Sequence, residues 1–129
     1  PFGFDLALEW LESDVENTAS AGWATLASHA SIKSDEELDL AKYEELLDSI
    51  PNKIQSAKNR EKYVMNGFVI AVGSYIPGLT AKAKEIAGKI GKITVDMNGT
   101  ACKVPFATDY IQKIEDKGRV GKKRKTARC

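Results

Sequence analysis

Apolar residues recur at helical spacing along most of the chain, and this periodicity predicts a series of short amphipathic helices. The predicted helices cover residues 4–12, 13–30, 34–49, 58–75, 79–90 and 106–117, with one short turn or helix near 50–57. Two of the predicted helices begin with a capping box, Ser13–Glu16 and Ser34–Glu37. In this motif the serine and glutamate side chains accept hydrogen bonds from backbone N–H groups that have no partner within the helix. Pro51 is expected to interrupt the third helix, because proline lacks the N–H that a helix interior uses.

The longest uncharged run, the 19 residues from Tyr63 to Ala81, is the centre of this pattern. Apolar residues lie on every side of a helical wheel drawn through Tyr63–Tyr75, which predicts a helix buried on all sides. The run is near the length of a membrane span, but Pro77 and Gly78 break it. A buried helix followed by a turn is therefore the favoured interpretation, and no membrane is expected as a partner.

After Gly91 the periodicity changes to the alternation that is typical of β-strands. Asn98-Gly99 lies between the alternating runs 93–97 and 100–104, and this dipeptide is a strong signal for a two-residue hairpin turn. In that register six side chains share one mostly apolar face: Ile93, Val95, Met97, Thr100, Cys102 and Val104. Since an isolated hairpin is marginally stable, it is expected to pack on the helices.

Helices in antiparallel pairs with short links, at intervals of roughly 40 residues, are typical of helical-repeat proteins. The predicted fold is mainly α: a HEAT-like solenoid of antiparallel helix pairs, an α–α superhelix, with one small β-hairpin near the C-terminus. A plain helical bundle is the alternative. Residues 1–91 would form the helical repeats, as the C-terminal part of a longer solenoid. Residues 92–129 would form the hairpin, the last helix and the basic tail of the same domain. A longer protein is also expected because the sequence has no initiator methionine.

The composition fits a globular domain with a modest core, since the 129 residues are 43% hydrophobic and 29% charged. The two cysteines, Cys102 and Cys129, lack the spacing of a disulfide framework, so a reducing cytoplasmic location is expected. His29 is the only histidine, which leaves too few ligands for a zinc site. No glycine-rich phosphate or dinucleotide motif is present, so neither a cofactor nor a metal is expected.

Charge is divided unevenly along the chain, although the net charge is only +1. Residues 1–50 carry a balance of −10 and residues 51–129 a balance of +11, and the last 13 residues hold seven bases and no acid. This asymmetry predicts an anionic partner, and DNA phosphates are the hypothesis. The candidate DNA-binding residues are Lys58, Arg60, Lys62, Lys103, Arg119, Lys122, Lys123, Arg124, Lys125 and Arg128. For the tail, a solvated terminus or a processing signal is the alternative.

The spacing of reactive side chains does not indicate a catalytic site. His29 is expected to cap or cover a helix end, and Trp10 and Trp23 to pack in the core. Cys102 is expected to pack as a small apolar residue. The acids of residues 34–49 spread over a solvated helix face and form no isolated carboxylate pair of the kind used in acid–base catalysis.

Four parts of the chain resemble the DNA alkylation repair family, the HEAT-like-repeat alkylpurine DNA glycosylases. Pro1–Trp10 resembles the family's Pro-Phe-then-helix segment, and Ala21–Ala24 resembles the small-residue helix that follows it. Arg60–Phe68 resembles the helix that lines the family's concave groove. Val95–Pro105 and the ending Gly118–Lys125 resemble one branch of alkylation-repair proteins. The likeness covers nearly the whole chain through diffuse motifs.

The resemblance implies a basic concave surface that binds duplex DNA, and the removal of N3- or N7-alkylated purines by an Asp, an Arg and Trp residues. The helix that carries the family's Asp would precede Pro1, and Ser20-Ala21 and Gly67 stand where its Arg and Trp are expected. No catalytic residue is therefore assigned. The predicted function is that of a DNA alkylation repair protein, which binds duplex DNA through a basic concave surface and could remove alkylated purines when full length, with its Asp outside this chain. The alternative is a non-catalytic HEAT-repeat scaffold that binds DNA or protein.

Overall fold

The computed structural model describes residues 2–11, 16–33, 38–54, 59–90, 107–118 and 120–121. Within these ranges the helices are α1 (Phe2–Trp10), α2 (Glu16–Ile32), α3 (Leu40–Ile54), α4 (Asn59–Tyr75), the 3₁₀ helix η2 (Pro77–Leu79), α5 (Thr80–Ile90) and α6 (Ala107–Asp116). Most of the predicted helices are therefore present, with ends that differ by a few residues.

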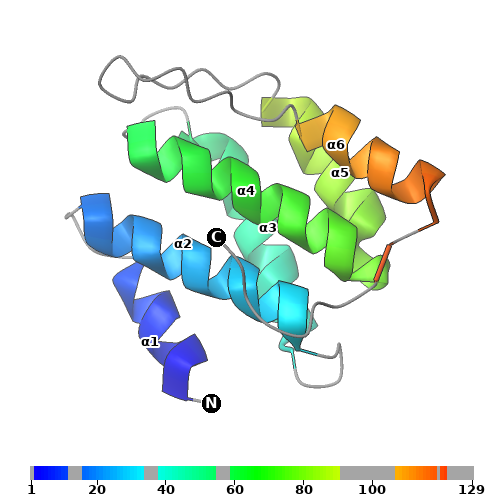
Figure 1. Ribbon diagram of the computed structural model, residues 1–129. Helices are drawn as coiled ribbons and strands as arrows, with labels where there is room; N and C mark the ends of the chain where they lie inside the picture. The colour runs from blue at the N-terminus through cyan, green and yellow to red at the C-terminus, as the bar shows by residue number, and fades with distance from the viewer. Residues whose placement is uncertain are drawn as a thin grey trace.

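The helices form two layers, as Figure 1 shows. In the front layer α2, α4 and α6 run in the same direction, and α4 contacts both of its neighbours. Behind them α3 and α5 pack on each other and on α4, and α1 packs on α2. A helix followed by its return helix in the other layer is the unit that stacks in helical-repeat proteins.

An aromatic cluster joins the two layers at the middle of α4. The Phe68 ring meets the Trp23 ring edge-on, with centroids 5.1 Å apart, and stacks on the Tyr43 ring at 5.7 Å. All three side chains are buried, and such ring pairs contribute about 0.5–1.5 kcal/mol beyond the area they bury. The predicted core position of Trp23 is confirmed, whereas Trp10 is only half-buried.

The tyrosine of this cluster also makes the polar link between α3 and α2. The Tyr43 hydroxyl donates a hydrogen bond to the Leu26 carbonyl oxygen over 2.7 Å. Burial raises the pKa of Tyr43, since the phenolate would lose its solvation inside the protein. The neutral phenol is therefore the form that the fold selects.

α4 is not buried on all sides, so that prediction is wrong. Tyr63 is 40% exposed, and Val64, Gly67 and Ile70 are only partly buried, while the opposite side with Phe68 is fully buried. Uncharged side chains thus cover the exposed side of α4 as well as its core side. This is why the helical wheel gave no sign of an outer face.

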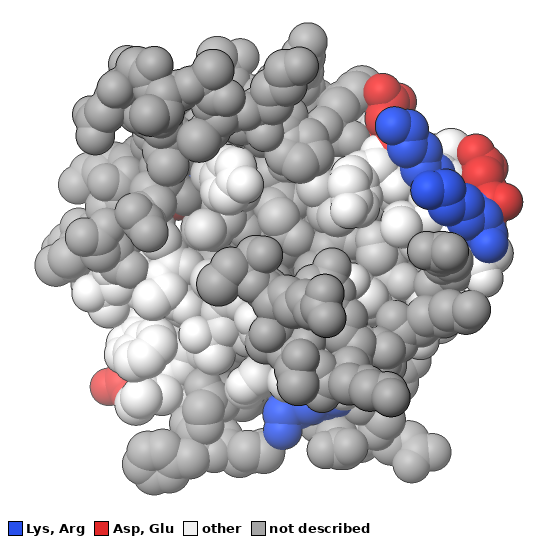
Figure 2. Space-filling view, viewed as in Figure 1, with Lys and Arg blue, Asp and Glu red and all other residues white. Residues whose placement is uncertain are grey.

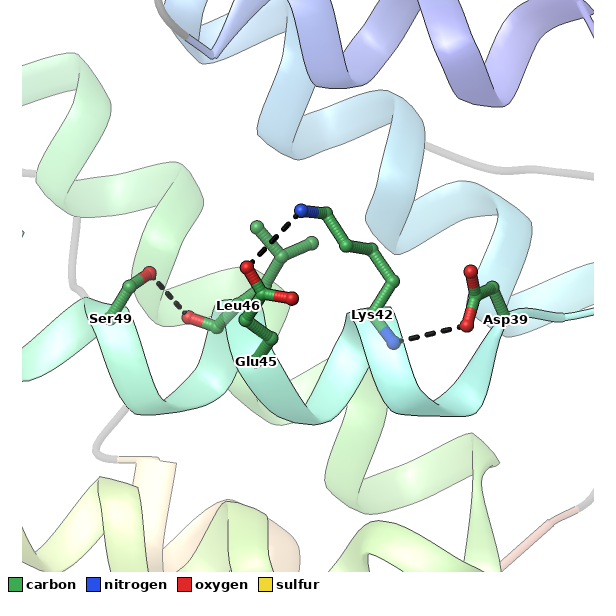
Figure 3. Close-up of polar contacts among 5 residues, drawn as sticks. All are labelled: Asp39, Lys42, Glu45, Leu46 and Ser49. Carbon is green, nitrogen blue, oxygen red and sulfur yellow. Dashed lines mark hydrogen bonds and ion pairs between the residues drawn. The ribbon is translucent and has the colours of Figure 1, made fainter.

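The start of α3 differs from the prediction because a different residue caps it. Asp39 Oδ1 accepts a hydrogen bond from the Lys42 backbone N–H over 3.1 Å, as Figure 3 shows, and this places Asp39 at the N-cap. Leu38 and Asp39 are not helical, so a helix that runs unbroken from Ser34 is wrong. Residues 34–37, which hold the predicted capping box, lie outside the described ranges.

Pro51 does not end α3, contrary to the prediction. The helix continues to Ile54, and the side chains of Ile50 and Ile54 are both buried on either side of the proline. Packing of this apolar face offsets the backbone hydrogen bond that proline cannot make. The short separate turn that was predicted near residues 50–57 is therefore the last turn of α3, as far as Ile54.

The predicted fold class, mainly α with a small β-hairpin, is corrected to all-helical. The ranges that the structure describes contain α-helices, one 3₁₀ helix and turns, with no strand among them. Residues 93–104, on which the hairpin was placed, lie outside those ranges. Alternation over two short runs was a weaker signal than the helical periodicity of the rest of the chain.

The uncharged run is divided between α4, η2 and the start of α5, so the predicted turn at Pro77-Gly78 is confirmed. In the described part of the chain no single helix has the length and apolar character to cross a membrane. One bent pair of helices, Glu61–Tyr75 with Pro77–Ile90, has the length and composition of a broken membrane span, and this rests on length and composition only. The bend between its two halves is 117°.

Candidate nucleic-acid interface

The exposed side of α4 belongs to the front layer and carries one large aromatic side chain. Tyr63, 40% exposed, lies directly after Lys62 near the start of the helix. One turn later, a Cβ added at Gly67 would meet no atom within 4 Å. A side chain at residue 67, one turn from Tyr63, would therefore have room.

The described surface of α2 and α4 shows few charged side chains. Figure 2 shows this face, with white atoms over α2 and α4 and with described charged side chains gathered mainly at the α6 edge. Exposed positions of α2 are taken by the small residues Ala21 and Ala24. A neutral surface of small residues allows close approach of a large partner but supplies no attraction for phosphates.

Many lysines elsewhere in the described part are paired with acids. The Lys82 ammonium lies 2.7 Å from Asp48, and this hydrogen bond is the main cause that raises the pKa of Lys82. The ion pairs are Lys82–Asp48 between α5 and α3, Lys84–Glu115 between α5 and α6, Lys89–Glu85 within α5 and Lys42–Glu45 within α3 (Figure 3). These lysines neutralise protein carboxylates, so they are poor candidates for binding phosphate.

Of the ten predicted DNA-binding bases, one has a described side chain. Lys62 is half-buried on the first turns of α4, and Arg60 is placed in the same helix by its backbone. The other eight, Lys58, Lys103, Arg119, Lys122, Lys123, Arg124, Lys125 and Arg128, lie outside the described ranges. The DNA-binding role of all ten stays a prediction.

The structure does fix where the basic tail begins. Two glycines with positive φ follow α6, Gly118 at 64° and Gly121 at 85°. The Gly118 N–H donates to the Glu115 carbonyl oxygen over 2.9 Å, which closes the helix in the left-handed manner typical of glycine. The Gly121 N–H then donates to the Ser74 carbonyl oxygen over 2.9 Å. The residue before Lys122 is thus held at the C-terminal end of α4.

The described residues supply neither a metal site nor the side chains that the resemblance implies for catalysis. Ser20 and Gly67, where the resemblance would place the family's Arg and Trp, offer neither a charge nor an aromatic ring, and Ser20 is buried. Burial and the nearby Lys33 charge lower the pKa of His29, which favours the neutral ring. Within the described ranges no three His, Cys, Asp or Glu side chains are grouped to hold a metal.

The fold has a counterpart among solved structures. The chain superposes with a TM-score of 0.87 and 32% identity on a protein described as "A new family of proteins related to the HEAT-like repeat DNA glycosylases with affinity for branched DNA structures". The match covers 97% of this chain and 53% of that protein. The resemblance drawn from the sequence is therefore confirmed at the level of a related fold, a helical-repeat fold of the DNA-glycosylase-related kind.

Two curated bacterial relatives match the same proportion of the chain. An uncharacterized protein of Listeria monocytogenes is 39% identical over 111 residues, and one of Listeria innocua is 38% identical over 111 residues. Each match covers 86% of this chain and 46% of the relative, so the chain spans about half the length of these curated relatives. No protein-family model matches the chain.

Proposed function

We propose that this chain is part of a helical-repeat protein that binds branched DNA without cutting a glycosidic bond. The observation that carries the proposal is the fold, which matches a protein with affinity for branched DNA over 97% of the chain at 32% identity. At that identity and TM-score the two chains share the arrangement of their helices, and we expect them to have a related DNA-binding surface.

Attraction to DNA would come from the basic segments at the two ends of α4. Arg60 and Lys62 belong to the start of this helix, and Gly121, the residue before the tail's Lys122, is bonded to Ser74 at its end. α4 has 17 residues, so it is about 25 Å long. Phosphate contacts at both ends would leave the neutral side of α4 facing the nucleic acid between them.

Tyr63 gives a physical reason for preferring a branched substrate. It is one of two large, exposed aromatic side chains in the described part of the chain, and it adjoins the basic residue Lys62. Bases at a branch point are easier to unstack than those of a duplex, and stacking on an exposed aromatic ring contributes about 1–3 kcal/mol per base. A linear duplex offers Tyr63 no such base.

Binding of the intact protein to a four-way junction and to a linear duplex of the same sequence tests the proposal. We expect tighter binding to the junction, and we expect Tyr63→Ala to reduce that preference while Tyr63→Phe keeps it. Tyr110, 44% exposed on α6 beside Asp109, provides the matched control, since Tyr110→Ala removes an equally exposed ring from an acidic setting. Equal affinity of the unchanged protein for the two DNAs would contradict the proposal.

The glycosylase alternative has a separate test. The relevant positions in this chain, Ser20 and Gly67, supply no catalytic group, so we expect no release of 7-methylguanine from methylated DNA by the intact protein. Release of 7-methylguanine that the substitution of a single carboxylate abolishes would favour the enzyme instead.

A further inference from the structure

We propose that Gly121 is a positioning residue, which fixes the start of the basic tail at the C-terminal end of α4. The anchor is the hydrogen bond from the Gly121 N–H to the Ser74 carbonyl oxygen, and it forms without any ligand. Its consequence for DNA binding rests on the proposed function, because it concerns where the tail's positive charges can reach.

The anchor supplies one of the hydrogen bonds at the end of α4. The last carbonyl groups of a helix have no partner within it. Here the Val72 oxygen accepts from the Ile76 N–H over 3.0 Å, and the Gly73 oxygen accepts from the Thr80 hydroxyl over 2.9 Å. The Ser74 oxygen accepts from Gly121, far along the sequence. The hydrogen bond between Gly121 and Ser74 is therefore part of the C-terminal cap of α4.

Two separate constraints require glycine at residue 121. Its φ of 85° lies in the left-handed region, which is costly for a residue with a Cβ. In addition, a Cβ at this position would lie 2.7 Å from Pro77 Cγ and 3.3 Å from Pro77 Cδ. The proline ring cannot swing away as the end of a long side chain can. Gly118 also has a positive φ, but a Cβ there would meet nothing within 4 Å, so only Gly121 is constrained by contact as well.

The anchor limits the space that the tail can search. From Gly121 to Arg128 there are seven residue steps, which span about 25 Å at most when fully extended. This reach equals the length of α4, about 25 Å. The anchor therefore limits the tail's bases to within about one helix length of Ser74, whichever direction the tail takes. Holding charges near their target raises their effective concentration there, which increases affinity without any new contact.

The substitution Gly121→Ala tests this inference, with Gly78→Ala as the matched control. Gly78 lies in η2 beside Pro77, and a Cβ there would meet nothing within 4 Å. Hydrogen exchange, without DNA, should show a protected amide at residue 121 in the unchanged protein and in Gly78→Ala, and fast exchange in Gly121→Ala. Junction binding should weaken severalfold in Gly121→Ala while its salt dependence stays the same, because no charge is removed.

The outcomes separate the anchor from the proposed function. Fast exchange of the Gly121 amide in the unchanged protein would overturn the anchor, whatever the protein binds. Lost protection in Gly121→Ala with unchanged DNA affinity would overturn the positioning role and leave DNA binding standing. If no variant binds DNA, the positioning role and the proposed function both fail, while the exchange data still decide whether the anchor exists.

Discussion

Gly67 and Gly73 lie in the same helix, yet the structure gives them opposite surroundings. A Cβ at Gly73 would lie 2.7 Å from Ile111 Cδ1 and 3.1 Å from the Ala83 Cβ, whereas a Cβ at Gly67 would meet nothing within 4 Å. Ile111 is fully buried, so it has little room to move. Gly73 therefore allows α5 and α6 to approach α4 closely, and Gly67 has no such packing role.

We expect Gly73→Ala to destabilise the protein by about 1–3 kcal/mol through overpacking. Gly67→Ala should stabilise it by about 0.5–1 kcal/mol, because alanine is the better helix former. Urea unfolding of the two variants beside the unchanged protein measures both effects. A Gly73→Ala variant as stable as Gly67→Ala would show that the packing of α6 on α4 is looser than described.

For single residues, the sequence predicted the burial of side chains better than it predicted which residues contact one another. Trp23 was expected in the core from the apolar spacing around it, and it is there. The pairing of Gly121 with Ser74 joins residues far apart in sequence, and no local pattern could have found it. The two glycines Gly118 and Gly121 before the basic tail were a visible sign of a tight turn, and that sign was missed.

The elements of this fold are joined by a small number of polar contacts as well as by the core. Lys84 and Glu115 link α5 to α6 with 2.6 Å between nitrogen and oxygen, but both side chains are about one-third exposed. Solvent screening keeps such a pair at about 1 kcal/mol or less. The hydrogen bond from Tyr43 to Leu26, which links α3 to α2, is fully buried, so its loss should matter more.

We expect Tyr43→Phe to cost about 0.5–1.5 kcal/mol near neutral pH, because the ring stacking remains and one buried hydrogen bond is lost. The raised pKa of Tyr43 adds a second expectation. The folded state holds its proton to higher pH than the unfolded state, whose ordinary value is 10.0. This contribution is fully present below about pH 10 and is lost as the pH rises above it.

Chemical unfolding of both proteins at neutral pH and above pH 10 measures these effects. The stability advantage of the unchanged protein over Tyr43→Phe should shrink as the pH rises above 10 and then change sign, since phenylalanine has no proton to lose. A difference that stays constant or grows through the alkaline range would contradict the buried, neutral phenol.

Helix type was predictable for this chain, and helix ends were not. Both Ser34 and Asp39 are good N-cap residues, and only the fold selects Asp39 for α3. Pro51 was expected to stop the same helix, but the buried residues Ile50 and Ile54 hold its last turn in place. Tertiary packing decided these cases over local preference.

For the molecule as a whole, the proposed DNA binding rests on the fold likeness together with the charge distribution. The helical arrangement matches a protein with affinity for branched DNA. The described surface of α2 and α4 shows few charges, and Lys42, Lys82, Lys84 and Lys89 are paired with acids. The positive charge that could attract DNA is therefore concentrated in the predicted basic segments, the start of α4 and the tail that begins beside its end.

The sequence alone could predict the sign and rough position of this charge, since seven of the last 13 residues are bases. It could not predict that the tail starts beside the end of α4, because that depends on the Gly121–Ser74 hydrogen bond. The structure also refines where a truncation should begin. Removal of residues 122–129 leaves the α4 cap intact, whereas removal from Gly121 onward would also take away the partner of Ser74.

The most direct test of the central claim is the salt dependence of junction binding by the intact protein, with and without residues 122–129. If six phosphates are contacted, affinity should fall about a thousandfold between 50 and 200 mM salt. Removing the tail should weaken binding at 50 mM and give a clearly shallower slope, while the urea unfolding curve stays the same. Equal affinity at both salt concentrations, or an unchanged slope after truncation, would contradict the claim that basic segments beside α4 bind DNA through its phosphates.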